Sequence, residues 1–448
     1  MTLRSGVAAL SFFLLAQAAA GDCVTPSWEL RVPVPPSAGN FGSSMVLRDF
    51  DGDAIADVVF VRANIADETA MFQRGKGYGF FDTPVDLYTS RPAGVHNPWG
   101  IEHLVARDLN RDGKLDLLLL ENLVRLVFLA GNGDGTFASP VSSSAAIGPA
   151  FAIDDLTGDD VNDVAAFYFS ETGFGVVLFT GTAGGTFTER ARFPLPAPPR
   201  GIATGDLDGD GANDIVAGYG DPSKLAVLFG RDDGSFEPAV DLDNGDSWAI
   251  KIELADLEKD GDLDIVVQKS SNFDHESDFL AVHRNHGGRT FDAVNLYPVP
   301  QQFTLTNYPV HTAVADVTGD GEPDLLAATG NMVVTRRGLG NGTFDAGYHF
   351  DLFPVSERST APIDTTDFDG DGRVDIIIGP GSFDGLRALR NHCGEVKVLL
   401  TPSTSTVVLG QGVVTVQVAT HSYSQDPLET TPPTPTGTVS IVEGATGR

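Results

Sequence analysis

Nine-residue loops rich in aspartate recur seven times along this 448-residue chain, and a run of apolar residues follows each of them. The fourth copy, Asp206 to Asp214, places carboxylates at positions 1, 3, 5 and 9 and glycine at position 6. In such a tight loop alternate side chains converge on one point, and the carbonyl of position 7 turns toward it. Ca²⁺ accepts about six to eight oxygens in flexible geometry. The sequence therefore predicts Ca²⁺ in these loops, with about five to seven ions per chain.

The candidate metal ligands stand at positions 1, 3, 5, 7 and 9 of loops one to seven. In chain order they are Asp49, Asp51, Asp53, Ile55, Asp57; Asp108, Asn110, Asp112, Lys114, Asp116; Asp155, Thr157, Asp159, Val161, Asp163; Asp206, Asp208, Asp210, Ala212, Asp214; Asp256, Glu258, Asp260, Asp262, Asp264; Asp316, Thr318, Asp320, Glu322, Asp324; and Asp367, Asp369, Asp371, Arg373, Asp375. Position 7 would contribute its backbone carbonyl. No loop contains Cys or His, which disfavours zinc and copper.

The seven copies are unequal. Loops four and seven are complete, whereas loop one has Ala54 at position 6, and loop three combines Thr157 at position 3 with Asp160 at position 6. We expect loop three to be the weakest site. The alternative is a set of hydrogen-bonded aspartate turns without metal. Crowded carboxylates repel one another unless a cation is present, and this repulsion favours the metal interpretation.

An EF-hand begins with a similar pattern but requires a Glu at position 12 and helices on both sides. Position 12 is apolar in every copy, which predicts buried strands and excludes that motif. These residues are Phe60, Leu119, Ala166, Ala217, Val267, Ala327 and Ile378.

The loops start 59, 47, 51, 50, 60 and 51 residues apart, which is the length of a four-stranded propeller blade. The spacing predicts an all-β, seven-bladed β-propeller. In the fourth repeat we expect strands at 201–204, 214–218 and 224–229, then a hairpin at 230–236 and an outer strand through Val240. The hairpin recurs, for example at 131–137 and 338–344, and its terminal Phe should pack between blades.

The chain carries 29 Lys and Arg against 61 Asp and Glu, a net charge of −32. This net negative charge disfavours nucleic acid as a partner, because phosphate binding needs a basic surface. Arg4, an apolar stretch at 7–16 and three alanines at 18–20 predict a secretory signal over residues 1–20, with the mature protein starting near Gly21. No other segment is long and apolar enough for a membrane span. We expect a secreted, monomeric protein.

The chain has two cysteines, Cys23 and Cys393, which export would make candidates for one disulfide. Residues 390–394 match 284–288 of the fifth repeat, where a last strand follows at 291–294. That strand is missing after Cys393, and an equivalent stands at 28–32. The N-terminal strand should therefore complete the seventh blade, with the disulfide in place of the missing turn. A lipoprotein anchor at Cys23 is the alternative, which Asp22 disfavours.

The paired signals, an Asp-x-Asp-x-Asp-Gly-x-x-Asp loop and a Gly-x-Gly-x-Gly-Thr-Phe hairpin, resemble the FG-GAP or VCBS-type repeats of secreted bacterial proteins and of the integrin α-chain propeller. The resemblance covers about Trp28 to Gly394, so the propeller domain is expected at 21–394. It implies Ca²⁺ in the loop between the first two strands of each blade and ligand recognition on the opposite face. Residues 395–448, with strands at 396–400 and 413–419, resemble the opening of a bacterial Ig-like domain.

Two functional hypotheses follow. The first is an extracellular binding or adhesion module for a glycan or protein ligand, without chemistry of its own, since the sequence contains no nucleophile motif, phosphate loop or HExxH. The lengthened connections between loops predict its ligand residues as Trp99, Phe273, His275, Tyr308 and His311. The second is a lyase-like enzyme acting on polysaccharide. A fold of this kind hosts many functions and does not choose between them.

Overall fold

The computed structural model consists of strands and loops, with no helix in the part of the chain that it describes. The described residues are 28–31, 40–63, 68–77, 81–90, 101–171, 173–220, 223–245, 248–270, 279–299, 311–329, 332–351, 363–368, 371–378, 387–391, 397–402 and 416–421. Among these residues no helix could cross a membrane.

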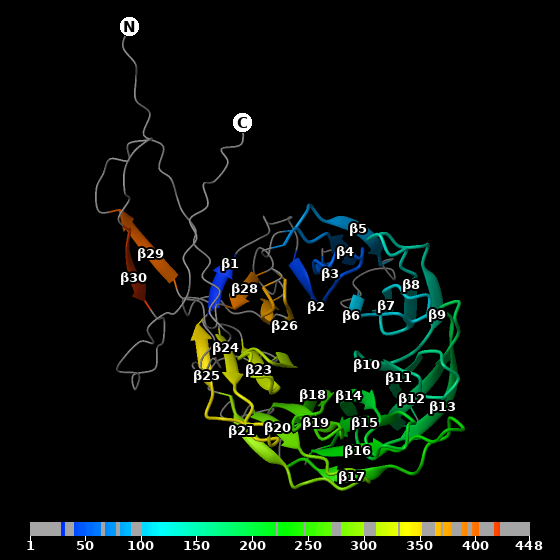
Figure 1. Cartoon of the computed structure of the whole chain (residues 1–448). Helices are drawn as coiled ribbons and strands as arrows, with labels where there is room; N and C mark the ends of the chain where they lie inside the picture. The colour runs from blue at the N-terminus through cyan, green and yellow to red at the C-terminus, as the bar shows by residue number, and fades with distance from the viewer. Residues whose placement is uncertain are drawn as a thin grey trace. The chain divides into compact units, whose positions relative to one another are not determined.

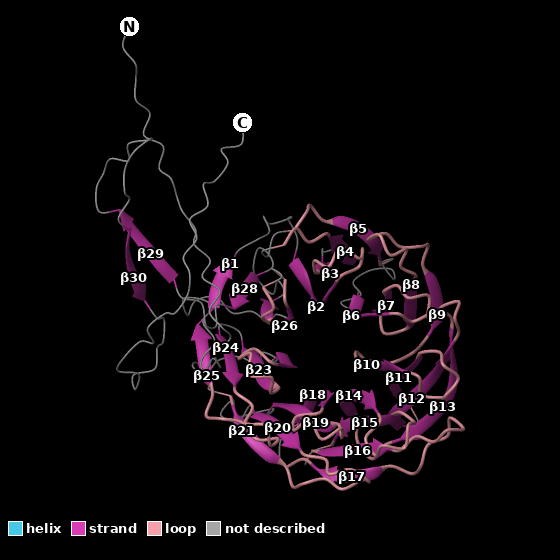
Figure 2. Ribbon diagram, viewed as in Figure 1, coloured by secondary structure: helices cyan, strands magenta, loops and turns pink. Residues whose placement is uncertain are grey.

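Seven antiparallel four-stranded sheets form the blades of a propeller (Figures 1 and 2). Blades one to three are β2 (Asn40–Arg48), β3 (Asp57–Ala63), β4 (Glu68–Gln73) and β5 (Val85–Thr89); β6 (Ile101–Arg107), β7 (Asp116–Glu121), β8 (Arg125–Leu129) and β9 (Val141–Ser144); and β10 (Phe151–Asp154), β11 (Asp163–Ser170), β12 (Gly173–Gly181) and β13 (Phe187–Pro194).

The remaining four blades repeat this order. They are β14 (Pro199–Gly205), β15 (Asp214–Tyr219), β16 (Lys224–Leu228) and β17 (Val240–Asp243); β18 (Trp248–Ala255), β19 (Asp264–Ser270), β20 (Phe279–His283) and β21 (Asn295–Pro298); β22 (His311–Ala315), β23 (Asp324–Thr329), β24 (Met332–Arg336) and β25 (Tyr348–Asp351); and β26 (Ile363–Thr366), β27 (Asp375–Ile378), β28 (Arg387–Asn391) and β1 (Trp28–Arg31). The predicted seven-bladed architecture is confirmed.

The N-terminal strand completes the last blade, as predicted. Strand β1 pairs antiparallel with β28, with Trp28 opposite Asn391 and Arg31 opposite Ala388. Figure 1 shows these strands, from opposite ends of the propeller sequence, side by side. Cys23 and Cys393 both lie outside the described residues, so the disulfide stays a prediction.

The apolar core is divided among the interfaces between neighbouring blades. Strand β7 is buried along its whole length because blades cover both of its faces. Seven hydrophobic clusters each combine side chains of two adjacent blades. The cluster containing Leu47 of β2 and Ile377 of β27 joins the first blade to the last and closes the ring. Burial of apolar surface is the main favourable term holding such blades together.

The hairpin phenylalanines pack between blades, as expected. Phe137 lies edge-on to Phe50 of the preceding blade at 5.7 Å between ring centroids, and Phe236 meets Phe193 in the same way at 5.3 Å. The prediction for the outer strands was less accurate. Pairing between Gly230 and Phe236 is an isolated bridge, and β17 begins only at Val240. Pro238 lacks the N–H that a continuous ladder needs. In blade five the outer strand begins at Asn295 rather than at residue 291.

The C-terminal strands β29 (Lys397–Pro402) and β30 (Val416–His421) pair antiparallel as a two-stranded sheet in a separate unit. They overlap the strands expected at 396–400 and 413–419. Two strands do not establish an Ig-like sandwich.

Candidate functional site

All seven aspartate loops lie at the same end of their blades. Each connects the first strand of a blade to the second, and the first strands, such as β2, β6 and β10, line the centre of the ring (Figure 1). Because every first strand runs in the same sense, the loops share one face of the propeller. The connections between the second and third strands lie on the opposite face.

The aspartate at position 1 organises each loop by accepting backbone hydrogen bonds. In loop four, Asp206 Oδ1 accepts from the N–H of Gly209 at 2.8 Å, and Oδ2 accepts from Gly211 at 2.9 Å. The position 5 carboxylate accepts from the N–H of position 7, as Asp210 does from Ala212 at 2.9 Å. The loops are therefore shaped by aspartate turns, which bring the remaining carboxylate lone pairs together.

Position 6 adopts the left-handed conformation in every loop. The φ angle is 93° at Gly211, and it is 66° at Ala54 and 68° at Asp160, where the sequence departs from glycine. Loops one and three thus keep the common shape despite their substitutions. Because a side chain at positive φ is strained, these two residues cost stability relative to glycine.

The aspartate at position 9 has a second role that sequence reasoning missed. Asp214 is fully buried; its Oδ2 accepts from the N–H of Leu207 at 2.9 Å, and its Oδ1 accepts from the N–H of Gly230 at 2.7 Å. It thereby fastens the aspartate loop to the hairpin after the third strand. The same two bonds recur at Asp57, Asp116, Asp163, Asp264, Asp324 and Asp375. The constant pairing of loop and hairpin along the sequence was the available signal.

Burial makes these position 9 carboxyls reluctant to ionise. It raises the pKa of Asp214 to about 7 and those of Asp57 and Asp264 to about 6, although their backbone hydrogen bonds act in the opposite direction. Neighbouring loop carboxylates add to the rise, since like charges disfavour ionisation. Burial likewise raises the pKa of Asp116 and of Asp163. A bound cation would supply the missing counter-charge.

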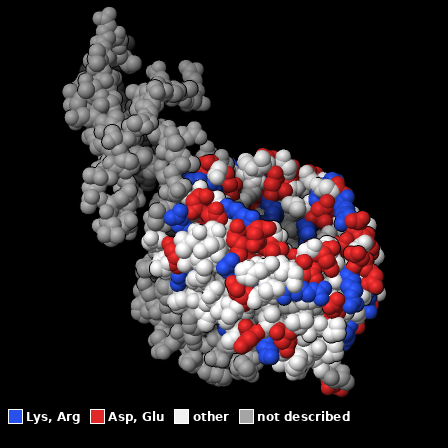
Figure 3. All heavy atoms as spheres, turned by 60° about the horizontal axis from the view of Figure 1, so that its bottom comes forward, with Lys and Arg blue, Asp and Glu red and all other residues white. Residues whose placement is uncertain are grey.

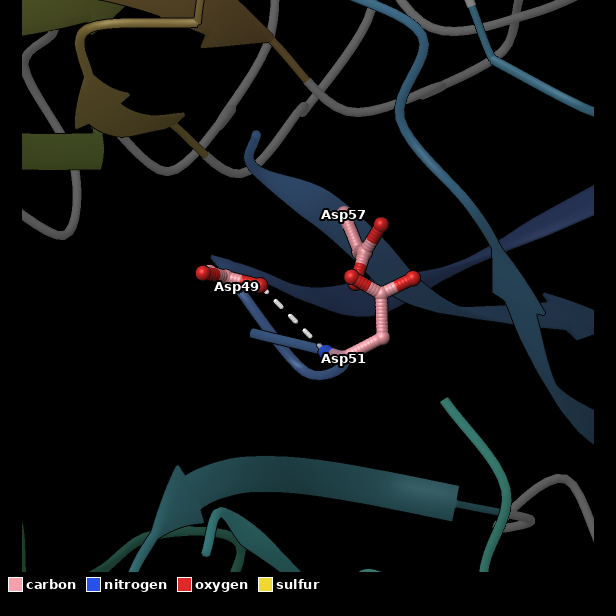
Figure 4. Close-up of side chains that lie close together, drawn as sticks. All are labelled: Asp49, Asp51 and Asp57. Carbon is pink, nitrogen blue, oxygen red and sulfur yellow. Dashed lines mark hydrogen bonds between the residues drawn. The ribbon is translucent and has the colours of Figure 1, made fainter. Parts of the chain in front are cut away.

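Two loops bring three carboxylates within metal-binding reach. One oxygen each of Asp49, Asp51 and Asp57 in loop one lie within 4.8 Å of one another. Figure 4 shows the carboxylates of Asp51 and Asp57 beside each other, with the Asp51 amide bonded to Asp49. Asp206, Asp208 and Asp210 of loop four converge in the same way. This oxygen-only donor set fits Ca²⁺.

The other predicted ligands converge less closely in the part of the chain that the structure describes. In loops two, three, five, six and seven the described acidic groups form no cluster of three within that distance. The position 7 residues, such as Ile55 and Ala212, donate their N–H groups to position 5 as the loop shape requires. Asp369 of loop seven lies outside the described residues.

Most of the predicted ligand-face residues are not described. Trp99, Phe273, His275 and Tyr308 lie outside the described residues, and His311 is placed by its backbone alone. His311 begins β22, at the end of that strand away from loop six. Its backbone is therefore on the face opposite the aspartate loops.

The described residues add two features on this opposite face. Val124, in the connection from β7 to β8, is 51% exposed, and Phe169, near the end of β11, is 52% exposed. In the same β7–β8 connection Asn122 and Leu123 both have positive φ, at 54° and 55°. Such a conformation is strained for leucine and is held by the surrounding structure.

The second feature is a stacked pair between blades four and five. The Arg200 guanidinium lies 3.3 Å from the centroid of the Trp248 ring. Both residues stand near the beginning of first strands, β14 and β18, and so at the end away from the loops. Burial lowers the pKa of Arg200. The sequence prediction did not include either residue, because their repeats are not lengthened at that point.

A solved lectin structure has a similar fold. No curated protein sequence matches the chain. Among solved structures, a lectin of Agrocybe aegerita, described as recognising non-reducing terminal N-acetylglucosamine, is 17% identical, with 76% of this chain and 86% of the lectin covered and a TM-score of 0.50. The biofilm matrix protein Bap1 of V. cholerae is 11% identical, with 82% of this chain and 91% of that protein covered and a TM-score of 0.43.

A family model described as "FG-GAP-like repeat" matches residues 155–217, 206–267 and 316–378. These three stretches contain loops three to seven, together with the strands that follow them. The family match agrees with the ring of seven four-stranded sheets: residues 155–267 and 316–378 match FG-GAP-like repeats, and the chain forms a seven-bladed β-propeller.

Proposed function

We propose that this protein is a secreted, calcium-stabilised propeller that binds an extracellular glycan or protein ligand on the face opposite its aspartate loops. The observation that carries the proposal is the difference between the two faces of the propeller. One face repeats the same acidic loop in every blade, whereas the other differs from blade to blade and exposes apolar side chains.

The loop face supports a role for Ca²⁺ in stability. Three carboxylates converge in loop one and three in loop four, and buried position 9 aspartates such as Asp214 have raised pKa values. A hard cation at these points would relieve both the mutual repulsion and the cost of ionisation. About five to seven ions would be bound if most of the seven loops are occupied.

The opposite face supports ligand binding. Val124 and Phe169 are exposed on blades two and three, and Trp248 carries a stacked arginine on blade five. Aromatic rings beside polar groups suit the apolar face of a sugar ring or a peptide side chain. A lectin of similar fold is described as recognising non-reducing terminal N-acetylglucosamine, which supports a glycan as one class of ligand.

A glycan array and a panel of matrix proteins would identify the ligand, and variants would then place the site. Phe169→Ala and Trp248→Ala should each weaken binding at least tenfold while leaving the melting temperature and calcium content unchanged. Leu296→Ala is the matched control, because Leu296 is 46% exposed on the outer strand β21. Equal binding by all three variants would remove this face from consideration.

The same screen also tests the enzyme hypothesis. Each polysaccharide that binds would be incubated with the protein and followed for new reducing ends and for the ultraviolet absorbance of unsaturated products. Depolymerisation that disappears in a variant of the opposite face would replace the binding-module proposal with a polysaccharide-acting enzyme.

A further inference from the structure

Arginine side chains pair with the acidic residues at position 3 of the aspartate loops. Arg74 Nε lies 2.8 Å from Asp51 Oδ2 in loop one, and Arg284 Nη2 lies 2.7 Å from Glu258 Oε1 in loop five. Both arginines stand immediately before the hairpin of the same blade. The paired acids are almost fully buried, with 3% and 8% of their side chains exposed.

In loop four the position 3 acid also pairs with an arginine, but this arginine comes from the neighbouring blade. Blade four has Phe229 before its hairpin, and Arg289 from the hairpin of blade five reaches across instead. Its Nε donates to Asp208 Oδ2 at 2.7 Å, and its guanidinium lies 4.2 Å from the centroid of the Phe229 ring. Asp208 Oδ1 accepts from the loop amide of Asp210 at 3.2 Å. One oxygen of this acid thus faces the loop and the other faces the arginine.

Two further loop acids, at positions other than 1, 3, 5 and 9, also form ion pairs with basic side chains. Asp160, at position 6 of loop three, lies 2.9 Å from Arg111 of loop two. Glu322, at position 7 of loop six, lies 2.9 Å from Lys259 of loop five. Figure 3 shows basic side chains beside the acidic patches on the face in view. Asp262, at position 7 of loop five, is the exception among the described loop residues.

Three of the seven loops have an uncharged residue at position 3. Loops two, three and six have Asn110, Thr157 and Thr318 there and carry three carboxylates at positions 1, 5 and 9. Loops one, four and five carry a fourth carboxylate at position 3, together with one paired guanidinium. After this pairing, loops one, two, four and five each keep three acids, at positions 1, 5 and 9, for a cation. In loop three, Asp155 at position 1 also lies 4.0 Å from Arg111. In loop seven, Arg390 lies 3.1 Å from Asp371 at position 5.

We propose that Arg74, Arg284 and Arg289 set the calcium affinity of their loops by neutralising the position 3 acid, so that loops with four acids bind Ca²⁺ as loops with three do. The proposal rests on calcium binding by the loops, which is part of the proposed function. It predicts that the number of acids in a loop does not rank its affinity. A guanidinium close to the cation opposes binding by direct repulsion, while the acid that it holds keeps an oxygen toward the loop.

A double-mutant cycle on Arg289 and Asp208 of loop four tests the proposal. Arg289→Gln leaves four uncompensated carboxylates and should tighten calcium binding by about three- to tenfold, the scale of one nearby unit charge at a partly exposed site. Asp208→Asn leaves three carboxylates beside an arginine that has lost its partner in the loop, so the site is one charge less negative than in the wild type, and it should weaken binding by a similar factor. The double variant returns to three carboxylates, with the asparagine that loop two has naturally, and should bind like the wild type.

Hydrogen–deuterium exchange of peptides covering residues 206–214, followed against free Ca²⁺ concentration, gives the midpoint of this one loop. Arg192→Gln is the control, because Arg192 pairs with Glu189 outside the loops, at 2.8 Å. Arg74→Gln, read from peptides over residues 49–57, repeats the test should Arg289→Gln fail to fold.

Weaker binding by Arg289→Gln would show that the arginine orients Asp208 instead and would overturn the proposal, as would a double variant that behaves like Asp208→Asn. Calcium-independent exchange in every loop of the wild type would refute calcium binding itself. That outcome is distinguishable from a failed cycle on a calcium-binding protein.

Discussion

Asp214 and Gly230 are joined by a 2.7 Å hydrogen bond from the glycine amide to the buried carboxylate, across sixteen residues of sequence. The other oxygen of Asp214 accepts from Leu207 inside the aspartate loop. Every blade repeats this bridge between loop and hairpin. The position 9 aspartate therefore joins the aspartate loop to the hairpin, whether or not a cation is bound.

Asp214→Ala should lower the free energy of unfolding by about 2–5 kcal/mol even in chelator, because two buried N–H groups lose their acceptor. Asp210→Ala is the control in the same loop, since Asp210 is exposed and orders only loop amides. In chelator it should cost less than about 1 kcal/mol. Urea denaturation of both variants measures the difference, and equal losses would contradict the fastening role.

The calcium-free protein should lose stability as pH rises from about 4 to 7. Burial raises the folded-state pKa of Asp214 to about 7 and those of Asp57 and Asp264 to about 6, above the unfolded value of about 3.9. A group with a raised folded pKa contributes stability below its unfolded pKa, and this contribution is lost as pH rises through the folded pKa.

Added Ca²⁺ should reverse this trend, because cation binding favours the ionised carboxylates and releases protons. Melting temperatures measured across this pH range in chelator and in Ca²⁺ should therefore diverge as pH rises. Parallel curves would mean that the buried carboxyls are not coupled to the cation.

Glycine at position 6 of loops one and three should stabilise the protein. Ala54→Gly and Asp160→Gly relieve a positive φ and should each add up to about 1 kcal/mol, less the entropy that glycine gains in the unfolded chain. Gly211→Ala is the reciprocal control at φ 93° and should destabilise by about 1–2 kcal/mol. Denaturant midpoints that move in the opposite direction would contradict the strain argument.

A disulfide between Cys23 and Cys393 should close the ring. Trp28, which follows Cys23 by five residues in the sequence, pairs with Asn391, which precedes Cys393 by two. In the chain-entropy model a loop of this length stabilises by up to roughly 5–6 kcal/mol. Non-reducing peptide mapping should find the linked peptides, whereas free thiols or a lipid-modified Cys23 would refute the link.

The sequence was sufficient for the architecture because the relevant signals are local and repeated. Asp214 begins a buried strand in the same way as Asp116 does, and the spacing of such residues specifies a blade. Pairing of β1 with β28 could be inferred because the last repeat lacked its outer strand. The start of β17 was misplaced because Pro238 interrupts the strand ladder, and only the pairing pattern shows where that ladder resumes.

The arginine partner of loop four could not be predicted in the same way. Arg289 and Asp208 are 81 residues apart and belong to different blades. Their contact depends on how adjacent blades pack, which no repeat motif encodes. The exposed Phe169 and the Arg200–Trp248 pair were missed for a related reason, since attention to lengthened connections passes over repeats of ordinary length.

The central claim is that the aspartate loops hold Ca²⁺ and that this cation stabilises the ring. Elemental analysis of protein purified in calcium-containing buffer and then desalted, combined with melting curves before and after chelation, tests it most directly. We expect about five to seven Ca²⁺ per chain and a lower melting temperature after chelation. Fewer than about three ions per chain, or a melting curve unchanged by chelator, would contradict the account and leave the loops as metal-free aspartate turns.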